Sequence, residues 1–176
     1  KFMAIKTIFL DRDGVINKEV SYLHKIKDFE FIKGVFEACK YFLDLNYSII
    51  IISNQSGIGR GLYSEEDYQK INQWMLNEFS LKNISILDTF HCPHEPKSNC
   101  SCRKPKPGMF FKAQKKYRID MNQSWMIGDK ETDIESANLA GINNTVLVRS
   151  GHKIDELTSN SKFIIDSIDQ CQNIIF

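Results

Sequence analysis

Short apolar runs that end abruptly in polar residues are the feature that most limits the fold of this chain. Residues 4–10 and residues 48–52 are short, apolar and rich in isoleucine, which is typical of strands buried on both faces. Strands of that kind belong to parallel sheets, because the helices that connect parallel strands cover both faces of the sheet. The two runs therefore predict an α/β fold.

Strand-like and helix-like segments alternate along the whole chain. This alternation predicts a doubly wound, mostly parallel sheet in a single domain that covers residues 1–176, with residues 92–107 as an irregular insertion. Ser64 and Asp67 have the spacing of a capping box at the start of one helix. Further strands are expected at 84–91, 124–127, 144–148 and 162–165, and helices at 35–45, 64–79, 107–118, 131–140 and 167–174.

Composition and charge limit the classes of function. The 176 residues are 42% hydrophobic and 26% charged, and the formal net charge is +1, so we expect a globular domain with no nucleic-acid or membrane partner. No apolar stretch approaches the roughly 20 residues that span a bilayer, and no signal peptide is recognised, so we expect a cytoplasmic enzyme. Nothing in the sequence demands an assembly, and a monomer is expected. Met3 is expected to be the natural start, with Lys1 and Phe2 added before it.

Asp11 and Asp13 follow the first predicted strand directly, and Gly14 permits a sharp turn after them. Open α/β sheets bind their ligands at the carboxyl ends of the strands, which is where this pair lies. Two charges there cost desolvation free energy unless a cation or a reaction uses them. The pair therefore predicts a site in which one carboxylate attacks an electrophile and the other moves a proton.

Two more polar clusters follow predicted strands. Residues 53–55 come after the second strand, and Asp129 follows the apolar run 125–127, with Asp133 four residues further on. Parallel strands point the same way, so all three clusters are expected at one edge of the sheet. A single aspartate at a strand end is usually a turn or a helix cap, but three clusters at one edge favour an active site.

Phosphoryl transfer to an aspartate is the chemistry that fits these residues. Asp11 is ionised at neutral pH and needs no base before it attacks, whereas Asp13 would protonate the leaving oxygen and later deprotonate water. Asp11 and Asp129 are suitable ligands for Mg²⁺, and Lys104 would neutralise a bound phosphate. The hydroxyl of Ser53 and the amide that follows it would hold the phosphate oxygens.

Three cysteines and a histidine lie close together in the irregular segment. They form two pairs of ligands separated by five residues, which matches a tetrahedral structural zinc site that would stiffen the loop and aim the basic residues after it. A disulfide within the second pair, strained at that spacing, and unpaired loop thiols are the alternatives. Cys39 and Cys171 lie on apolar faces and are expected in the core. The predicted zinc ligands are Cys92, His94, Cys100 and Cys102.

Three other histidines and a glycine-rich segment receive no catalytic role. His91 is expected to be packed or solvated rather than a partner of the zinc loop, and neither His24 nor His152 is assigned a function. Residues 57–61 lack the lysine of a P-loop and the Gly-x-Gly-x-x-Gly spacing, so a nucleotide-binding loop is excluded.

Taken together, these motifs resemble those of the haloacid dehalogenase-type phosphatases, and most closely their D,D-heptose 1,7-bisphosphate phosphatase branch. Two departures are visible, because Val15 stands where threonine is common and the segment between His94 and Cys100 is shorter than in some members. The resemblance covers residues 4–150, and no catalytic role is inferred for residues 151–176. The matching motifs are FLDRDGVIN at 9–17, SNQSGIGRG at 53–61, the zinc ligands with RKP at 103–105 and PGM at 107–109, and GDK at 128–130.

This resemblance implies an activity and a fold without a large cap domain. The implied reaction is Mg²⁺-dependent removal of the C7 phosphate of D-glycero-D-manno-heptose 1,7-bisphosphate through an aspartyl-phosphate intermediate. The product, heptose 1-phosphate, would serve nucleotide-activated heptose and lipopolysaccharide biosynthesis. A structural Zn²⁺ is implied beside the Mg²⁺, and the partner is a small sugar bisphosphate.

The resemblance also implies roles for single residues. Asp11 resembles the nucleophile and a magnesium ligand, and Asp13 resembles the acid/base whose backbone carbonyl also faces the metal. Asp129 completes the protein's magnesium ligands, while Ser53 and Lys104 steady the phosphoryl group. Contacts with the substrate are implied for Glu19, Val20, Ser21, Tyr22, Ser53, Asn54, Gln55, Ser56, Arg60, Arg103, Lys104 and Lys130, with Arg103 as the reader of the retained phosphate.

Two alternative functions share some of these features. A histidinol-phosphate phosphatase has the aspartate motifs and a similar zinc loop, but its second motif more often reads Asn-Gln-Asp-Gly, whereas this chain has Ser56 in place of that aspartate. Arg60 and Arg103 also suit a second phosphate better than an amino alcohol. A non-catalytic zinc-loop binding module is the other alternative, and the near-neutral charge speaks against a nucleic-acid ligand.

Overall fold

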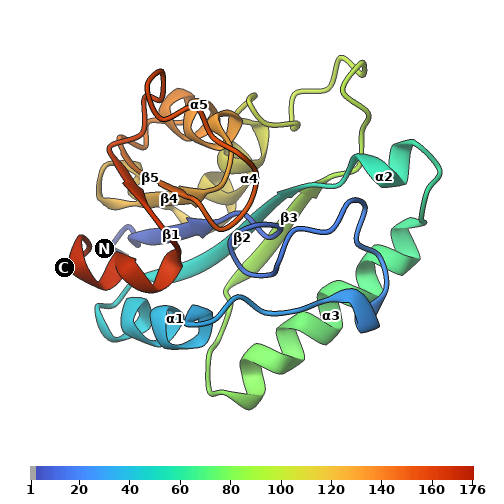
Figure 1. Ribbon diagram of the computed structural model, residues 1–176. Helices are drawn as coiled ribbons and strands as arrows, with labels where there is room; N and C mark the ends of the chain where they lie inside the picture. Colours follow the sequence, from blue (N-terminus) through green and yellow to red (C-terminus); the bar gives the residue numbers. More distant parts are fainter. Residues whose placement is uncertain (1–2) are drawn as a thin grey trace.

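The computed structural model describes residues 3–176 and consists of one six-stranded sheet with helices on both faces (Figure 1). All strand pairs are parallel, and the strand order is β3-β2-β1-β4-β5-β6. The predicted doubly wound parallel α/β fold is therefore confirmed, and Lys1 and Phe2 lie outside the described residues. The strands are β1 (Thr7–Leu10), β2 (Ser48–Asn54), β3 (Asp88–Cys92), β4 (Trp125–Gly128), β5 (Asn144–Val148) and β6 (Phe163–Ile165).

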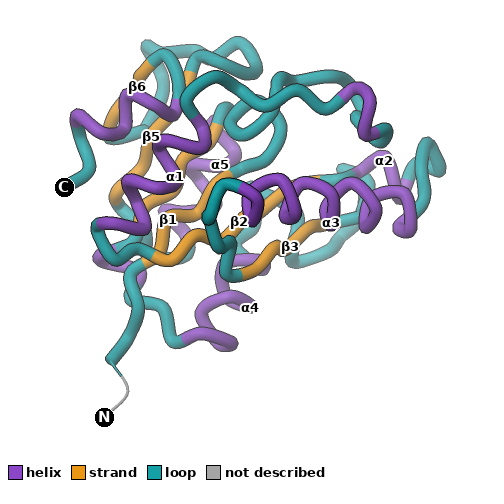
Figure 2. Tube along the Cα trace, turned by 90° about the horizontal axis from the view of Figure 1, so that it is seen from below, coloured by secondary structure: helices purple, strands orange, loops and turns teal. Residues whose placement is uncertain are grey.

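The helices form two layers, one on each face of the sheet. In Figure 1, α1 and α3 lie on one side of the strands with the C-terminal 3₁₀ helix, and α4 and α5 lie on the other. Figure 2 shows the first of these faces, with α3 along the β2–β3 edge of the sheet. The helices are α1 (Val35–Asp44), α2 (Ser56–Gly59), α3 (Glu65–Leu81), α4 (Gly108–Tyr117) and α5 (Glu131–Leu139), and the 3₁₀ helices are η1 (Ile26–Asp28), η2 (Met121–Gln123) and η3 (Ile168–Asn173).

Alternation along the central strands divides the core into two parts. Ile49 and Ile51 of β2 face the α1 and α3 layer, whereas Ile50 and Ile52 face the α4 and α5 layer. All four side chains are at most 1% exposed. Successive side chains of a strand point to opposite faces, so a strand covered on both sides must be apolar throughout. This is why the isoleucine run at 48–52 is continuous rather than alternating.

Most predicted boundaries are confirmed within a few residues, and the differences have local causes. The capping box at Ser64 and Asp67 is present, with each side chain accepting a hydrogen bond from the backbone N–H of the other residue. The first strand begins only at Thr7, and Ile5 forms an isolated bridge with Ile119 instead. The third strand begins at Asp88 rather than at 84, and the last helix is a 3₁₀ helix.

Two further observations concern what the described residues do not form. No helix within residues 3–176 is long and apolar enough to cross a membrane. Residues 93–107, between β3 and α4, contain no helix or strand, which agrees with the predicted irregular insertion.

Adjacent phenylalanines on α4 provide a test of this packing. Phe110 is fully buried with its ring centroid 4.9 Å from that of Phe9, whereas Phe111 is 48% exposed. We predict that Phe110→Ala lowers the free energy of unfolding by about 3–5 kcal/mol, because it removes buried apolar surface and leaves a cavity. Phe111→Ala, the matched control on the same helix, should cost less than about 1 kcal/mol. Equal losses in urea unfolding would contradict the assignment of the buried face.

Candidate active site

A cavity of about 300 Å³ opens at the carboxyl end of the sheet. It lies where the predicted clusters meet, since the chain leaves β1, β2 and β4 at this edge. Ser53 and Asp129 do not line it, but all the other predicted catalytic, substrate-binding and magnesium-binding residues do. The lining side chains are Asp11, Asp13, Glu19, Val20, Ser21, Tyr22, Leu23, Asn54, Gln55, Ser56, Gly57, Arg60, Tyr63, Arg103, Lys104, Lys130, Thr132, Asp133 and His152.

Lys104 is buried between two carboxylates at the base of the cavity. Its Nζ lies 3.0 Å from Asp11 Oδ1 and 2.6 Å from Asp133 Oδ1, and it donates to the carbonyl oxygen of Ile52 at 2.9 Å. Burial alone would lower the pKa of Lys104, but the two carboxylates outweigh that effect and raise it. The ammonium group is therefore fixed and charged.

The buried position of Asp11 disfavours its ionised form. Burial, followed by the charge of Asp133, raises the pKa of Asp11 well above its ordinary value, although Lys104 opposes this shift. Burial and Asp133 also raise the pKa of Asp129. Three carboxylates close together in a site of low polarity repel one another, and a bound cation would relieve that repulsion.

The three carboxylates could hold a metal ion. One oxygen each from Asp11, Asp129 and Asp133 lies within 4.8 Å of the others. Asp133 is already committed, because Lys104 takes one oxygen and the backbone N–H groups of Asp129 and Lys130 donate to the other at 3.1 Å. In Asp129, by contrast, Oδ1 is buried without a hydrogen-bond partner. An orphaned carboxylate oxygen next to Asp11 fits a hard cation such as Mg²⁺.

The other oxygen of Asp129 is held by a residue that the sequence did not predict. His152 donates to Asp129 Oδ2 from its backbone N–H at 2.9 Å and from Nδ1 at 2.6 Å. Its Nε2 lies 3.7 Å from Glu19 Oε1, across the cavity mouth. His152 follows β5, the neighbour of β4. Polar residues after parallel strands were expected at this edge of the sheet, and the same argument could have placed His152 there. No function was assigned to His152 or to residues 151–176 from the sequence, so this contact with Asp129 was missed.

Asp13 is held by a set of donors. Arg12 Nη2 lies 2.9 Å from Oδ1 and 3.0 Å from Oδ2, Asn17 Nδ2 donates to Oδ1 at 3.0 Å, and Gln55 Nε2 donates to Oδ2 at 3.2 Å. Burial would raise the pKa of Asp13, but the Arg12 charge and these hydrogen bonds outweigh it, so the pKa is lowered. These donors favour the ionised form of Asp13, which is the form that accepts a proton.

The residues at the carboxyl end of β2 are arranged differently from the sequence expectation. The buried Ser53 hydroxyl accepts a hydrogen bond from Gln55 Nε2 at 2.6 Å and does not line the cavity. Asn54 exchanges two hydrogen bonds of 3.1 Å with the backbone of Lys104. The Asn54 amide therefore fixes the segment that delivers the lysine, and the predicted contact of Ser53 and Asn54 with phosphate oxygens stays a prediction.

Cationic side chains line the mouth of the cavity. Arg60, Arg103 and Lys130 all face it, and the guanidinium of Arg60 lies 6.0 Å from the centre of the Tyr22 ring. In Arg103 the Nη1 atom is buried and has no hydrogen-bond partner. Guanidinium groups donate two parallel hydrogen bonds to phosphate, so this end of the cavity is suited to an anion.

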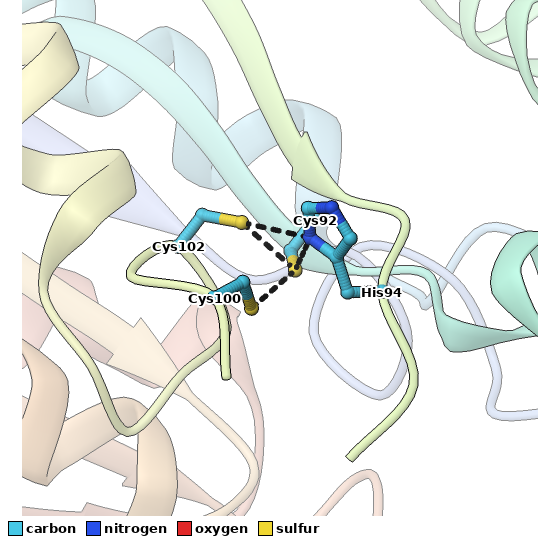
Figure 3. Close-up of side chains that lie close together, drawn as sticks. All are labelled: Cys92, His94, Cys100 and Cys102. Carbon is cyan, nitrogen blue, oxygen red and sulfur yellow. Dashed lines mark hydrogen bonds between the residues drawn. The ribbon is translucent and has the colours of Figure 1, made fainter. Parts of the chain in front are cut away.

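The side chains of the four predicted zinc ligands point toward one another (Figure 3). All five cysteines are free, so a Cys100–Cys102 disulfide is excluded in this structure. Burial raises the pKa of Cys100, but hydrogen bonds from the backbone N–H of Arg103 and from the neighbouring thiols outweigh this effect and lower that pKa to about 6. A thiolate is the form that ligates metal. The distances are 3.4 Å from Cys92 Sγ to His94 Nδ1, 3.3 Å from that nitrogen to Cys102 Sγ, and 3.0 and 3.8 Å from Cys92 Sγ to the sulfurs of Cys102 and Cys100.

The rings of the remaining two histidines pack against tyrosines. His91 lies with its ring centroid 4.0 Å from that of Tyr68, and its Nε2 is 2.8 Å from Glu65 Oε1. His24 stacks on Tyr63 with a centroid distance of 5.3 Å. The expectation that His91 is packed, rather than a partner of the zinc ligands, is confirmed.

Comparison with known proteins identifies similar molecules. The HAD-hydrolase-like family model matches residues 101–171. Two phosphatases of Photorhabdus laumondii are similar over most of their length: a D-glycero-alpha-D-manno-heptose-1,7-bisphosphate 7-phosphatase, 51% identical over 89% of this chain and 90% of the relative, and its beta-anomer counterpart, 41% identical over 94% and 92%. A D,D-heptose 1,7-bisphosphate phosphatase from B. bronchiseptica, solved with magnesium and phosphate, is 26% identical with a TM-score of 0.83 and covers 96% of this chain and 97% of that one.

The buried lysine gives a test of the electrostatics at this site. We predict that Lys104→Met lowers the free energy of unfolding at pH 7 by about 3–5 kcal/mol in magnesium-free buffer, because two buried carboxylates lose their cation. The pKa of Asp11 is raised in the folded protein, so its ionised form destabilises the fold at neutral pH. Acidification that protonates Asp11 should therefore reduce the loss of unfolding free energy caused by Lys104→Met.

The matched control for this substitution is Lys116→Met. Lys116 pairs with Asp88 at 2.7 Å, but its side chain is 59% exposed, so its removal should cost much less. Denaturant unfolding of both variants at pH 7 and pH 5 measures the difference. A Lys104→Met loss that is independent of pH would contradict the electrostatic explanation.

Proposed function

Because this chain belongs to the D-glycero-D-manno-heptose-1,7-bisphosphate 7-phosphatase family of HAD-like hydrolases, we propose that it removes the 7-phosphate of this sugar and leaves heptose 1-phosphate. The chain is an enzyme, a phosphoric monoester hydrolase. The observation that carries the assignment is 51% identity to such a phosphatase over 89% of the chain. The cavity supports it, because carboxylates lie at its base and cationic side chains line it, among them Arg103 with an unpaired Nη1 atom.

Asp11 is proposed as the nucleophile. Lys104 holds Asp11 Oδ1, so the second carboxylate oxygen is the one that attacks phosphorus. The same lysine attracts the incoming phosphate, whose charge would otherwise repel the carboxylate. Asp11, Asp129 and the backbone carbonyl of Asp13 would hold Mg²⁺. Bound there, the ion would supply the positive charge that offsets the raised pKa of Asp11 and orients a phosphate oxygen.

Asp13 is proposed to move the proton. It gives a proton to the leaving O7 oxygen of the sugar as the bond from that oxygen to phosphorus breaks. It then takes a proton from the water that attacks the aspartyl-phosphate, and this second step releases inorganic phosphate and restores Asp11. Arg12 favours the ionised form of Asp13 when no substrate is bound. A phosphate dianion bound nearby would raise the pKa of Asp13 and favour the protonated form that acts as the acid.

The retained phosphate is proposed to bind Arg103 and Arg60. Arg103 has an unsatisfied, buried Nη1 atom, and a buried donor without a partner costs free energy until a ligand satisfies it. Arg60, which directly follows α2, faces the same cavity. Glu19 to Tyr22 and Lys130 line the space between the two ends and are proposed to contact the sugar.

The α anomer is proposed as the preferred substrate. Photorhabdus laumondii has a phosphatase named for each anomer, and this chain is 51% identical to the one named for the alpha anomer but 41% identical to the one named for the beta anomer. The β anomer is the second candidate, and histidinol phosphate is the alternative from the sequence. A monomeric state and a cytoplasmic location stay predictions.

A structural zinc ion is proposed in the loop between β3 and α4. Cys92, His94, Cys100 and Cys102 supply three sulfurs and one nitrogen, and such a set fills a tetrahedral site completely. Such an ion would have no open position for substrate. Its proposed role is to hold Arg103 and Lys104 in place, since both follow the last ligand directly.

Substrate preference tests the proposed function. In the presence of Mg²⁺, kcat/KM for the α anomer of heptose 1,7-bisphosphate should exceed that for the β anomer by about tenfold or more, and histidinol phosphate should be the poorest substrate. Asp11→Asn is the matched control, because its amide cannot attack phosphorus. Preference for histidinol phosphate would overturn the substrate, and activity in Asp11→Asn would overturn the aspartyl-phosphate mechanism.

Metal analysis tests the zinc proposal. Freshly purified, reduced protein should contain about one zinc per chain, and Cys102→Ser should lose the zinc and lower the melting temperature. Cys39→Ala is the matched control, because Cys39 is buried in the core and far along the chain from the cluster. Wild-type protein without zinc would defeat the proposal.

A further inference from the structure

We propose that Tyr63 is a positioning residue for Asp13 and acts through Gln55. The inference rests on the proposed function, in which Asp13 is the acid and base. It also gives a structural role to Gly57 in the glycine-rich segment 57–61, which is not a nucleotide-binding loop. The Tyr63 hydroxyl donates to Gln55 Oε1 at 2.5 Å, and Gln55 Nε2 donates to Asp13 Oδ2 at 3.2 Å. Two hydrogen bonds therefore connect the tyrosine to the carboxylate.

The hydroxyl of Tyr63 selects one orientation of the Gln55 amide. An ionised carboxylate only accepts hydrogen bonds, so the nitrogen of the amide must face Asp13. The oxygen of the amide then points away and needs a donor, which is the Tyr63 hydroxyl. Burial raises the pKa of Tyr63 to about 12, so that hydroxyl keeps its proton. The same amide nitrogen also donates to Ser53 Oγ at 2.6 Å, which fixes its position further.

The Tyr63 ring is itself held on two sides. The ring of His24 stacks on it, with an angle of 6° between the planes. Gly57 of α2 contacts the ring so closely that any Cβ at this position would overlap its edge. Tyr63 is 6% exposed, and it lies next to Ser64, the N-cap of α3. Gly57 is thus glycine because an aromatic ring occupies the place of its side chain.

Removal of this hydroxyl should affect proton transfer more than binding. Without it, the buried oxygen of Gln55 loses its donor and the amide can rotate, so Asp13 Oδ2 loses a fixed partner. Arg12 still holds both oxygens of Asp13, and Asn17 still holds Oδ1, so the carboxylate stays in the site but loses one of the donors that orient it. A poorly oriented acid matters most when the leaving group needs a proton.

The experiment compares two leaving groups under single-turnover conditions with rapid quench. For Tyr63→Phe, phosphoryl transfer from the heptose bisphosphate, an alkyl phosphate, should slow about tenfold, part of the 10²–10⁴-fold that a general acid contributes. KM, measured separately in the steady state, should stay within about twofold. With p-nitrophenyl phosphate, whose leaving group departs without a proton, the rate of the first step should change less than about twofold. Tyr41→Phe is the matched control, because Tyr41 donates to the Ile175 carbonyl at the other end of the fold.

A second variant tests the same connection from the other side of the ring. Gly57→Ala displaces the ring without touching its hydroxyl, and it should show the same dependence on the leaving group. The double variant should be no slower than Tyr63→Phe, because both changes break one connection. Equal slowing with both phosphates, or a change confined to KM, would overturn the proposal and leave Tyr63 as a wall of the cavity. Failure of the proposed function would look different, because the wild-type enzyme would not hydrolyse the heptose bisphosphate. Wild type and Tyr63→Phe would then be compared with an alkyl phosphate that the enzyme does hydrolyse.

Discussion

The ammonium group of Lys104 is the point on which the active site depends. It lies between carboxylates from two different elements, Asp11 after β1 and Asp133 on α5, and neither could be buried there without it. The lysine comes from a long loop that has no secondary structure of its own, so its position must be fixed in another way. Asn54 binds its backbone on one side, and the four-ligand cluster constrains the loop on the other. Sheet, helix and loop are thus joined through one charge.

The sequence predicted the parts of the structure that follow local rules. Apolar runs such as 48–52 predicted buried strands, and the edge of a parallel sheet predicted that Asp11 and Asp129 would meet. The contacts that it missed join side chains far apart in the chain. His152 reaches Asp129 from a polar loop without a motif, and the Ser53 hydroxyl turns toward Gln55 rather than the cavity. Orientation of a side chain depends on neighbours that periodicity does not identify, which is why α2 within the glycine-rich segment was also missed.

The two candidate metal sites differ in the chemistry of their donors, and the difference matches their places in the fold. Carboxylate oxygens at the edge of the sheet suit a hard cation that exchanges water and phosphate, and Asp129 Oδ1 is left unpaired there. Thiolates and an imidazole in the loop suit a softer ion that is held permanently. Because Mg²⁺ prefers oxygen ligands, it has little affinity for the thiolate site. The loop can therefore be stiffened without interference at the reacting centre.

The order of the strands has a consequence for biosynthesis. β1 is made first, yet it lies in the middle of the sheet, where Ile8 pairs with Ile49 on one side and Trp125 on the other. One edge of β1 therefore stays without its partner while the ribosome adds more than a hundred residues. Contacts so distant along the chain form slowly, and an unpaired apolar strand can associate with other chains in the meantime. The nascent chain thus carries its nucleophile on a strand that is exposed to aggregation until β4 emerges, and chaperones would be most useful during that interval.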